Sequence, residues 1–344
     1  MEGPSRRQIL AGAAGLSALG LVGSAAAARI RTMKPKALKK GDLIGLFAPA
    51  GNIESEDELQ KAVSKIESLG FRVKVGSNVM RQKGYLAGTD QERADDVNAM
   101  FADPEVDGMI AVRGGYGVTR MLHLLNYDLV KRNPKFVCGY SDLTALLNGL
   151  FRKTGLVTFH GPVGTSSWTD FDIENFMKVA TGFDGEWLMP TSDAVPFPRA
   201  QTFVPGTSTG RLIGGNLSLI ASMVGTPYFP PAEDSILFIE DLDEDVYRLD
   251  RMLTQIWSSG AFSKLKGFVI GSLKLPNQKE GEPARTDDEM IAMLAERCKL
   301  FGVPAFSGAS VGHISKKLTL PIGCRARIDA EARTITLLES PVIP

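Results

Sequence analysis

Cysteine and histidine are scarce in this chain. Only three of each occur among its 344 residues, and no HExxH-type spacing joins the histidines. The cysteines, Cys138, Cys298 and Cys324, are too few and too far apart for a disulfide scaffold or a cysteine-rich zinc site. We therefore expect neither a metal ion nor a cofactor, and any histidine base must be one of only three side chains.

Net charge is also missing. Lys and Arg together number 39, as do Asp and Glu, so the formal net charge is zero. This balance argues against a nucleic-acid partner bound by bulk positive charge and gives no support for a polybasic membrane surface. The N-terminal apolar run of about 14 residues is shorter than the roughly 20 that span a bilayer, so we expect no stable membrane anchor.

Residues 1–28 are predicted to be a twin-arginine-type signal peptide. Arg6 and Arg7 precede a weakly apolar run from Ile9 to Val22, and small residues at A-x-A spacing follow as far as Ala28. A charged start, an apolar middle and a small-residue end are typical of secretory signals, and the paired arginines favour the twin-arginine route. The sequence therefore predicts a periplasmic protein.

The remaining chain is long enough for two α/β domains. In residues 37–186, short apolar runs such as 43–48 and 108–112 alternate with helical periodicity, which predicts a mostly parallel sheet with helices on both faces. Residues 187–209 are rich in proline and lack periodicity, and we interpret them as a linker. Residues 210–344 alternate less regularly and predict a smaller α+β domain.

The sharpest local pattern is a buried strand that runs into Gly139-Tyr140-Ser141-Asp142 directly before a helix. A serine at the carboxyl end of a parallel strand lies where open α/β sheets place their sites, which makes Ser141 a candidate nucleophile. Two observations weaken this reading. Leu143 stands where a G-x-S-x-G elbow has its second glycine, and Ser141 or Asp142 could act only as a helix cap.

A serine nucleophile needs a base and an acid that orients it. His123 lies in a leucine-rich helical stretch and is expected to be structural, whereas His313 lies in a glycine-flanked loop and is the better candidate base, with His160 second. Glu240 ends the apolar strand 236–239 and could orient that base. It could equally serve the N-terminus of the following helix, the role we assign to Asp243, Glu244 and Asp245.

Two glycine pairs also follow apolar strands. Arg113-Gly114-Gly115-Tyr116-Gly117 allows backbone amides to point at an anion, as an oxyanion hole requires, but its spacing does not match a dinucleotide-binding loop. Gly214-Gly215-Asn216 is a similar turn between a strand and a helix, for which a simple connecting role is the default interpretation.

Taken in order, these segments resemble the murein tetrapeptide LD-carboxypeptidase family of serine peptidases. The resemblance covers residues 37–340 and rests on seven short motifs. They are Gly41-Asp42-Leu43-Ile44 with Ala48-Pro49-Ala50, Arg113-Gly114-Gly115-Tyr116-Gly117, Gly139-Tyr140-Ser141-Asp142, His160-Gly161-Pro162, Gly214-Gly215-Asn216-Leu217, Glu240-Asp241 and Gly312-His313. It implies a flavodoxin-like or amidotransferase-like N-terminal domain, a smaller C-terminal α+β domain, a site between them, and a homodimer.

The resemblance also implies roles for individual residues. Ser141 becomes the nucleophile, His313 the base and Glu240 the orienting acid, and the backbone amides of Gly115 and Asp142 form the oxyanion hole. A free terminal carboxylate on a small peptide substrate needs a cationic partner, for which Arg113 and Arg248 are candidates.

The expected activity is hydrolysis of the L,D-peptide bond to a terminal D-alanine in murein tetrapeptides. Two alternatives remain at this level. One is a related serine amidase that cleaves peptide-nucleotide antibiotics, and the other is a periplasmic solute-binding protein, which explains the export signal but not the Ser-Glu-His combination. Export is a departure from well-known family members, which act in the cytoplasm on recycled wall peptides.

Overall fold

The computed structural model describes residues 30–193, 197–277 and 287–344, and residues 31–344 form one compact unit. The predicted signal peptide, residues 1–28, lies outside the described residues. Within the described ranges, no helix is both long enough and apolar enough to cross a bilayer.

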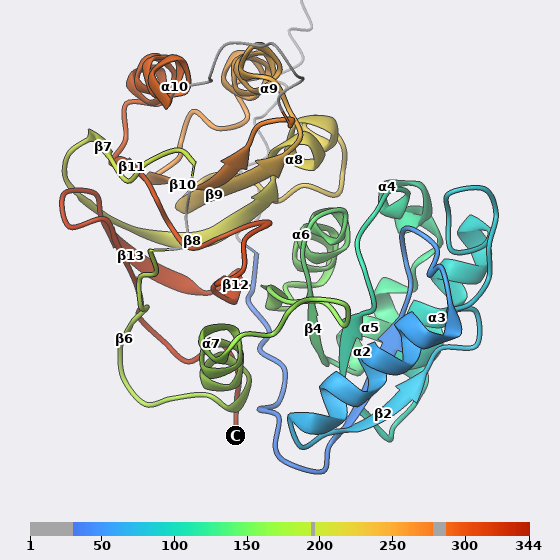
Figure 1. Cartoon of the computed structure of the whole chain (residues 1–344). Coiled ribbons are helices and arrows are strands. Elements are labelled where there is room, and N and C mark those ends of the chain that lie inside the picture. Colours follow the sequence, from blue (N-terminus) through green and yellow to red (C-terminus); the bar gives the residue numbers. More distant parts are fainter. Residues whose placement is uncertain (1–29, 194–196, 278–286) are drawn as a thin grey trace, which may run out of the picture. The chain divides into compact units, whose positions relative to one another are not determined.

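The first sheet has six strands in the order β12-β5-β4-β3-β1-β2. All neighbouring pairs are parallel except β12 with β5. The strands are β1 (Leu43–Phe47), β2 (Arg72–Val75), β3 (Val106–Ala111), β4 (Phe136–Gly139), β5 (Thr158–His160) and β12 (Leu320–Ile322). The predicted parallel-sheet α/β domain is therefore confirmed (Figure 1).

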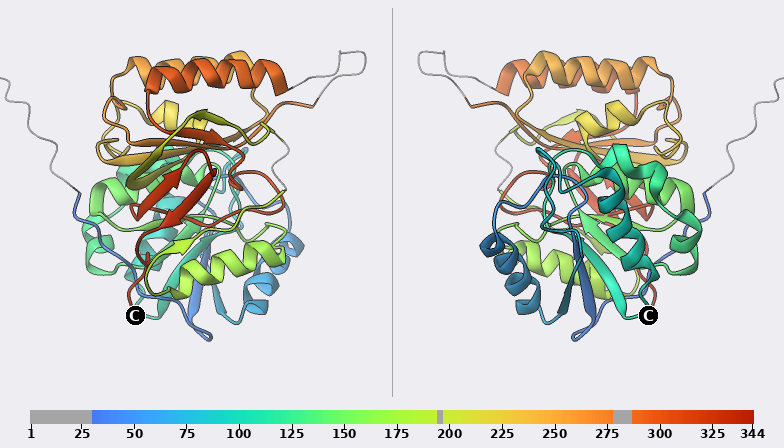
Figure 2. Two further views of the ribbon diagram at one scale, coloured as in Figure 1. Left: turned by 90° about the vertical axis from the view of Figure 1, so that its left-hand side faces the viewer. Right: turned by 90° about the vertical axis from the view of Figure 1, so that its right-hand side faces the viewer.

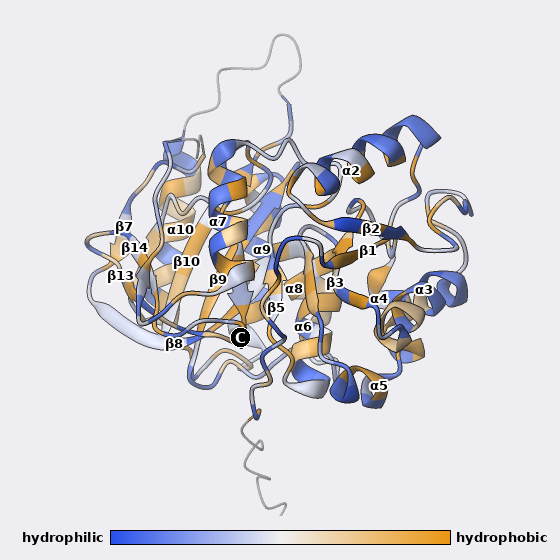
Figure 3. Ribbon diagram, turned by 90° about the horizontal axis from the view of Figure 1, so that it is seen from below, coloured by the Kyte–Doolittle hydropathy of each residue, from blue (hydrophilic) through white to orange (hydrophobic). Residues whose placement is uncertain are grey.

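Helices cover both faces of this sheet. Seen from below in Figure 3, α2 and α7 lie on one face and α3 to α6 on the other. Their bounds are α2 (Glu56–Ser68), α3 (Asp90–Ala102), α4 (Val118–Met121), α5 (Tyr127–Arg132), α6 (Leu143–Thr154) and α7 (Asp170–Thr181), with a 3₁₀ turn η1 (Leu122–Leu124). Side-chain caps explain several starts, because Ser55, Thr89 and Thr169 each accept a backbone N–H of the first turn. Glu92 completes a capping box with Thr89.

The second sheet has eight strands in the order β6-β14-β13-β8-β9-β10-β11-β7, of which β8 to β11 run parallel. The strands are β6 (Trp187–Leu188), β7 (Thr202–Val204), β8 (Thr207–Asn216), β9 (Ser235–Leu242), β10 (Gly267–Lys274), β11 (Ala305–Ser307), β13 (Arg325–Asp329) and β14 (Thr334–Leu337). Helices α8 (Leu217–Met223), α9 (Val246–Ser258) and α10 (Asp287–Phe301) lie along one face of it (Figures 1 and 2).

The stretch 187–209, predicted as a linker, is built into the second sheet. It contains β6, β7 and the first residues of β8. Within residues 187–209, each of these strands contributes only two or three residues, and prolines lie between them. The sequence therefore shows no alternating pattern there. Conversely, β12 belongs to the second half of the chain but joins the first sheet, where it pairs with β5 at the edge.

The core is formed by the central strands. All residues of β1 and β4 are buried, as are the first seven residues of both β9 and β10. Figure 3 shows β1, β9 and β10 in the apolar interior, with polar residues on the outer faces of the helices. Strands buried on both faces read as continuous apolar runs, which is why the sequence pattern located them.

Candidate functional site

Ser141 occupies a strained turn between β4 and α6. Its φ of 64° lies in the left-handed region, which costs a non-glycine residue free energy and persists only where the surroundings hold it. The side chain is half-buried, and Gly139 lets the turn close because a Cβ there would lie 2.7 Å from Leu143 Cγ. A tight strand-to-helix turn of this kind presents a serine hydroxyl at the edge of the sheet.

Glu240 and His313 form a hydrogen-bonded pair. Glu240 Oε2 lies 2.7 Å from His313 Nδ1, with the Glu240 side chain fully buried and the His313 ring partly exposed. Burial alone would raise the pKa of Glu240, but the charge and hydrogen bond of His313 lower it below its ordinary value. An ionised carboxylate at Nδ1 holds the ring orientation and leaves Nε2 as the free, basic nitrogen.

Gly312 makes this pair possible. Its φ is 114°, and a Cβ at this position would lie 2.7 Å from Glu240 Cβ and 2.9 Å from Glu240 Oε2. Any side chain would therefore push the His313 loop away from the carboxylate.

Contacts between α6 and β8 bring the second sheet to the serine turn. Thr144 Oγ1 accepts the Asn216 N–H at 2.9 Å, and Asn148 Nδ2 donates to the Gly214 carbonyl at 2.8 Å. Asn216 is the register partner of Glu240 in the parallel pair β8–β9. Gly214, Gly215 and Asn216 are therefore not the turn that the sequence suggested but the last residues of β8, and they fix Glu240 relative to the helix that follows Ser141.

Tyr140 links the serine turn to the histidine. The centroid of its ring lies 4.8 Å from that of the His313 ring. Because Tyr140 directly precedes Ser141 in the chain, this contact brings the histidine next to the serine turn. Among the described contacts, Ser141 and His313 share no hydrogen bond, as is common when no substrate draws the groups together.

The other two histidines occupy different surroundings. His123 lies exposed in η1. His160 is buried at the end of β5, and burial lowers its pKa to about 4. Neither ring nitrogen of His160 has a partner within the described residues, and its ring contacts Tyr140 edge-on. Of the three, only His313 lies against a carboxylate in the described contacts.

The Gly114-Gly115 loop lies directly against the serine. A Cβ on Gly114 would lie 2.9 Å from Ser141 Cβ and 3.1 Å from Ser141 Oγ. Within the described part of the chain, the N–H groups of Gly115 and Asp142 donate no hydrogen bond. Two amide donors without an internal acceptor, on either side of a serine, suit the stabilisation of a developing oxyanion.

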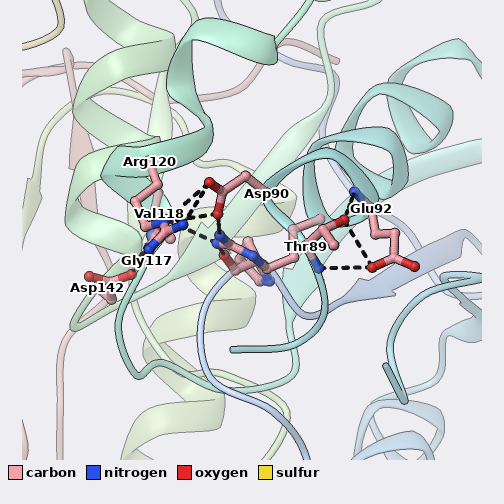
Figure 4. A network of polar contacts seen from close by, with 9 residues as sticks. Thr89, Asp90, Glu92, Gly117, Val118, Arg120 and Asp142 are labelled. Atoms are coloured by element: carbon pink, nitrogen blue, oxygen red, sulfur yellow. Dashed lines mark hydrogen bonds and ion pairs between the residues drawn. The ribbon is translucent and has the colours of Figure 1, made fainter. Parts of the chain in front are cut away.

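A polar network anchors this loop from behind (Figure 4). Asp142 Oδ2 accepts the Val118 N–H at 2.8 Å, and the buried Arg93 donates to the carbonyls of Pro49 and Gly117, the latter at 2.9 Å. Burial raises the pKa of Asp142 to about 6, against the opposing effect of the Val118 hydrogen bond and Arg93.

Asp90 completes the network on its outer side. It pairs with Arg93 and accepts three hydrogen bonds from Arg120 at 2.9–3.1 Å. The hydrogen bond and charge of Arg120, followed by those of Arg93, hold the pKa of Asp90 below its ordinary value despite partial burial.

The two arginines that were candidates to bind a substrate carboxylate lie close to acidic side chains of this chain instead. Arg113 donates to the Asn52 carbonyl and lies 3.8 Å from Glu58, and Arg248 lies 3.6 Å from Glu244. No described hydrogen bond or ion pair joins either arginine to the Ser141, Glu240 or His313 side chains.

Sequence reasoning gave no site role to three buried polar side chains beside these groups, although Asp241 belongs to the Glu240-Asp241 motif. Lys317, 4% exposed, lies with its Nζ 5.5 Å from the centre of the Tyr140 ring, and burial lowers its pKa. Asp241 accepts hydrogen bonds from Asn216 and Ser218, and burial raises its pKa to about 6. Arg93 is the third. The sequence held one signal for Arg93, because it is a charged residue on the buried face of a helix. No local sequence pattern distinguishes Lys317. The described residues contain no cluster of three metal-ligating side chains.

Comparison with known proteins places these features in a family. The LD-carboxypeptidase N-terminal domain matches residues 44–161, and the LD-carboxypeptidase C-terminal domain matches residues 209–328. A Bacillus subtilis relative, named as a probable murein peptide carboxypeptidase, is 35% identical over 88% of this chain and 94% of its own length.

Two solved structures share the fold. A MccF-like protein from Bacillus anthracis superposes with a TM-score of 0.80 at 32% identity, covering 90% of this chain and all of that one. A muramoyltetrapeptide carboxypeptidase from Oxalobacter formigenes superposes with a TM-score of 0.72 at 30% identity, covering 86% and 97%. From the two domain matches and the near full-length likeness of these proteins, the chain belongs to the LD-carboxypeptidase family.

Proposed function

We propose that this protein is a serine L,D-carboxypeptidase that hydrolyses the bond to the terminal D-alanine of murein tetrapeptides. The observation that carries the proposal is the 2.7 Å pair of Glu240 and His313 beside the strained Ser141 turn. The names of the Bacillus subtilis and Oxalobacter formigenes relatives support a murein peptide as the substrate.

The proposed mechanism assigns a role to each of these groups. His313 Nε2 takes the proton from Ser141 Oγ as the oxygen attacks the carbonyl carbon, and Glu240 stabilises the imidazolium that forms. The amides of Gly115 and Asp142 donate to the oxyanion. His313 then protonates the leaving nitrogen of D-alanine, and a water molecule activated by the same imidazole releases the tripeptide from Ser141.

The test is release of D-alanine from purified murein tetrapeptide. Wild-type protein is expected to release one D-alanine per tetrapeptide, and Ser141→Ala to release none above background. Unchanged activity in Ser141→Ala would rule out the serine mechanism. A second assay with a tripeptide lacking the terminal D-alanine controls for other peptidase activity.

The alternative is amide cleavage of a peptide-nucleotide antibiotic. The structural similarity to a MccF-like protein keeps this function open. Hydrolysis of an aminoacyl sulfamoyl adenylate, with no D-alanine release from tetrapeptide, would select it. Ligand binding without turnover of either compound would instead favour a solute-binding protein.

We further propose that the enzyme acts in the periplasm as a homodimer. The N-terminal pattern around Arg6 and Arg7 supports export, which suggests trimming of wall peptides outside the cytoplasm rather than recycling. Cell fractionation with Arg6→Lys and Arg7→Lys tests export, and light scattering tests the oligomeric state.

A further inference from the structure

The Asp142 side chain has an unusual hydrogen-bond partner for a residue at a helix N-cap. Asp142 occupies the N-cap position of α6, where an aspartate ordinarily accepts an N–H of its own helix, yet it makes no such cap bond. Its carboxylate instead accepts the N–H of Val118, the first residue of α4, at 2.8 Å. A buried hydrogen bond therefore joins the residue after Ser141 to the residue after the glycine loop.

We infer that the Asp142 carboxylate is a positioning group that sets the distance between the two amides of the oxyanion hole. One amide belongs to Asp142 itself and the other to Gly115, three residues before Val118. The inference rests on the proposed serine mechanism and adds a role that the mechanism does not require of a side chain.

The glycine loop, Arg113 to Gly117, needs such support because three of its five residues have no side chain. Arg113 binds the Asn52 carbonyl and the Tyr116 ring contacts Tyr85, so in the described contacts neither of these side chains joins the loop to the serine turn. Gly115 has a φ of 134°, and a Cβ there would lie 2.6 Å from the Gly51 nitrogen, so only bare backbone fits between the two loops. The Gly51 N–H donates to the Gly114 carbonyl at 3.2 Å, which holds one side of the loop.

Arg93 holds a second side. Arg93 is buried, with 1% of the residue exposed, and its guanidinium binds the carbonyls of Pro49 and Gly117, which ties the glycine loop to the segment after β1. Neither of these contacts reaches the serine turn. Among the described side-chain hydrogen bonds, the one from the Val118 N–H to Asp142 therefore joins the end of the glycine loop to the turn that carries Ser141.

The experiment measures how fast a fluorophosphonate probe labels Ser141, which does not depend on the natural substrate. Ser141 Oγ forms a bond to phosphorus, the P–F bond breaks, the serine proton passes to His313, and fluoride leaves. The phosphoryl oxygen occupies the oxyanion hole during this step, so the rate reports the alignment of the two amides. Ser141→Ala is the blank, and mass spectrometry locates the label.

Asp142→Ala is expected to lower the second-order labelling rate by at least about tenfold, because misplacing a donor by roughly 1 Å costs up to about 100-fold. Asp142→Asn keeps an oxygen acceptor for Val118 and is expected to recover most of the rate. In the tetrapeptide assay, Asp142→Ala should lower kcat with little change in KM, since the amides act on the transition state.

Asp96 provides the matched control. It is also a buried carboxylate that accepts a backbone N–H, that of Asn78 at 3.0 Å, but it lies on α3 away from the serine turn. Asp96→Ala should lower Tm as Asp142→Ala does and leave the labelling rate within about twofold.

Wild-type labelling rates in Asp142→Ala, or equal losses in Asp142→Ala and Asp96→Ala, would overturn the positioning role. Labelling of Ser141 without D-alanine release would refute only the proposed substrate. Absence of labelling in the wild type would refute the serine mechanism and the inference together.

Discussion

Glu240 Oε2 lies 2.7 Å from His313 Nδ1, although the two residues are 73 positions apart and belong to a strand end and a loop. The carboxylate is fully buried and the imidazole partly open, so the pair has one protected side and one side available for chemistry. The proposed function depends on this pair more than on any other contact.

Replacing Glu240 with glutamine should strongly impair His313 as a base, although the glutamine amide can still form a hydrogen bond with the His313 ring. A neutral amide no longer stabilises the imidazolium or favours the correct tautomer, and a comparable change in other triads costs about 10⁴-fold in kcat. We expect a loss of this order for Glu240→Gln in D-alanine release. Glu339→Gln is the control, since Glu339 binds Lys34 and the Arg325 N–H instead. Similar kcat values for both variants would contradict the assigned role of Glu240.

Gly312→Ala should separate His313 from Glu240. The new Cβ would lie 2.7 Å from Glu240 Cβ, and a displacement of about 1 Å can cost about 100-fold in kcat. Gly260→Ala is matched, because Gly260 also has a positive φ, 69°, but has open space around it. We expect both variants to lose about 1 kcal/mol of stability from the left-handed backbone. Only Gly312→Ala should lose the downfield NMR resonance of the His313 Nδ1 proton; if that resonance persists, the steric argument fails.

Thr144→Val should loosen the contact that brings Glu240 to the serine turn. Valine has the same shape but no acceptor for the Asn216 N–H, and a buried donor left unpaired costs about 1–3 kcal/mol. Thr158→Val removes a buried hydroxyl that donates to the Leu147 carbonyl within the first half of the chain. Chemical denaturation should show destabilisation in both. A lower kcat is expected only for Thr144→Val, and an equal kcat loss in the two variants would count against this coupling.

Asp142 should make stability depend on pH. Burial raises its pKa from 3.8 to about 6, so the folded state binds the proton more tightly than the unfolded state. The resulting stability is fully present below about pH 4 and is lost as the pH rises through about 6, by about 3 kcal/mol in all. The free-energy difference between wild type and Asp142→Asn should therefore change by about this amount between pH 4 and pH 7. A difference that does not vary with pH would show that Asp142 titrates normally.

The fold was largely predictable because its central strands are buried on both faces. Their apolar runs, with helical periodicity between them, located β1 to β5, β9 and β10 within a few residues. Strand β8 was not located, because its first residues were assigned to the linker and its last three were interpreted as a turn. The pairing of β12 with β5 was not predictable, because three residues carry no signal for the sheet they join. The same reason explains why the stretch 187–209 looked like a linker although β6 and β7 lie in it.

The candidate site was predictable in part. Residue types and turn chemistry made Ser141, His313 and Glu240 candidates, and the family resemblance assigned their roles. The structure brings the last two together. The carboxylate of Asp142 was interpreted only as a cap, because its actual partner, Val118, is 24 residues away and contributes a backbone N–H that any residue could supply. Arg93 was missed for a similar reason, since both carbonyls that it binds belong to the backbone.

The most direct test of the account is to identify the atom that carries the acyl group during turnover. Wild-type protein mixed with murein tetrapeptide is quenched in acid within milliseconds, and peptide mapping by mass spectrometry locates the adduct. We predict a tripeptide ester on Ser141 together with one released D-alanine. D-alanine release without an adduct on Ser141, and equally fast in Ser141→Ala, would contradict the serine mechanism.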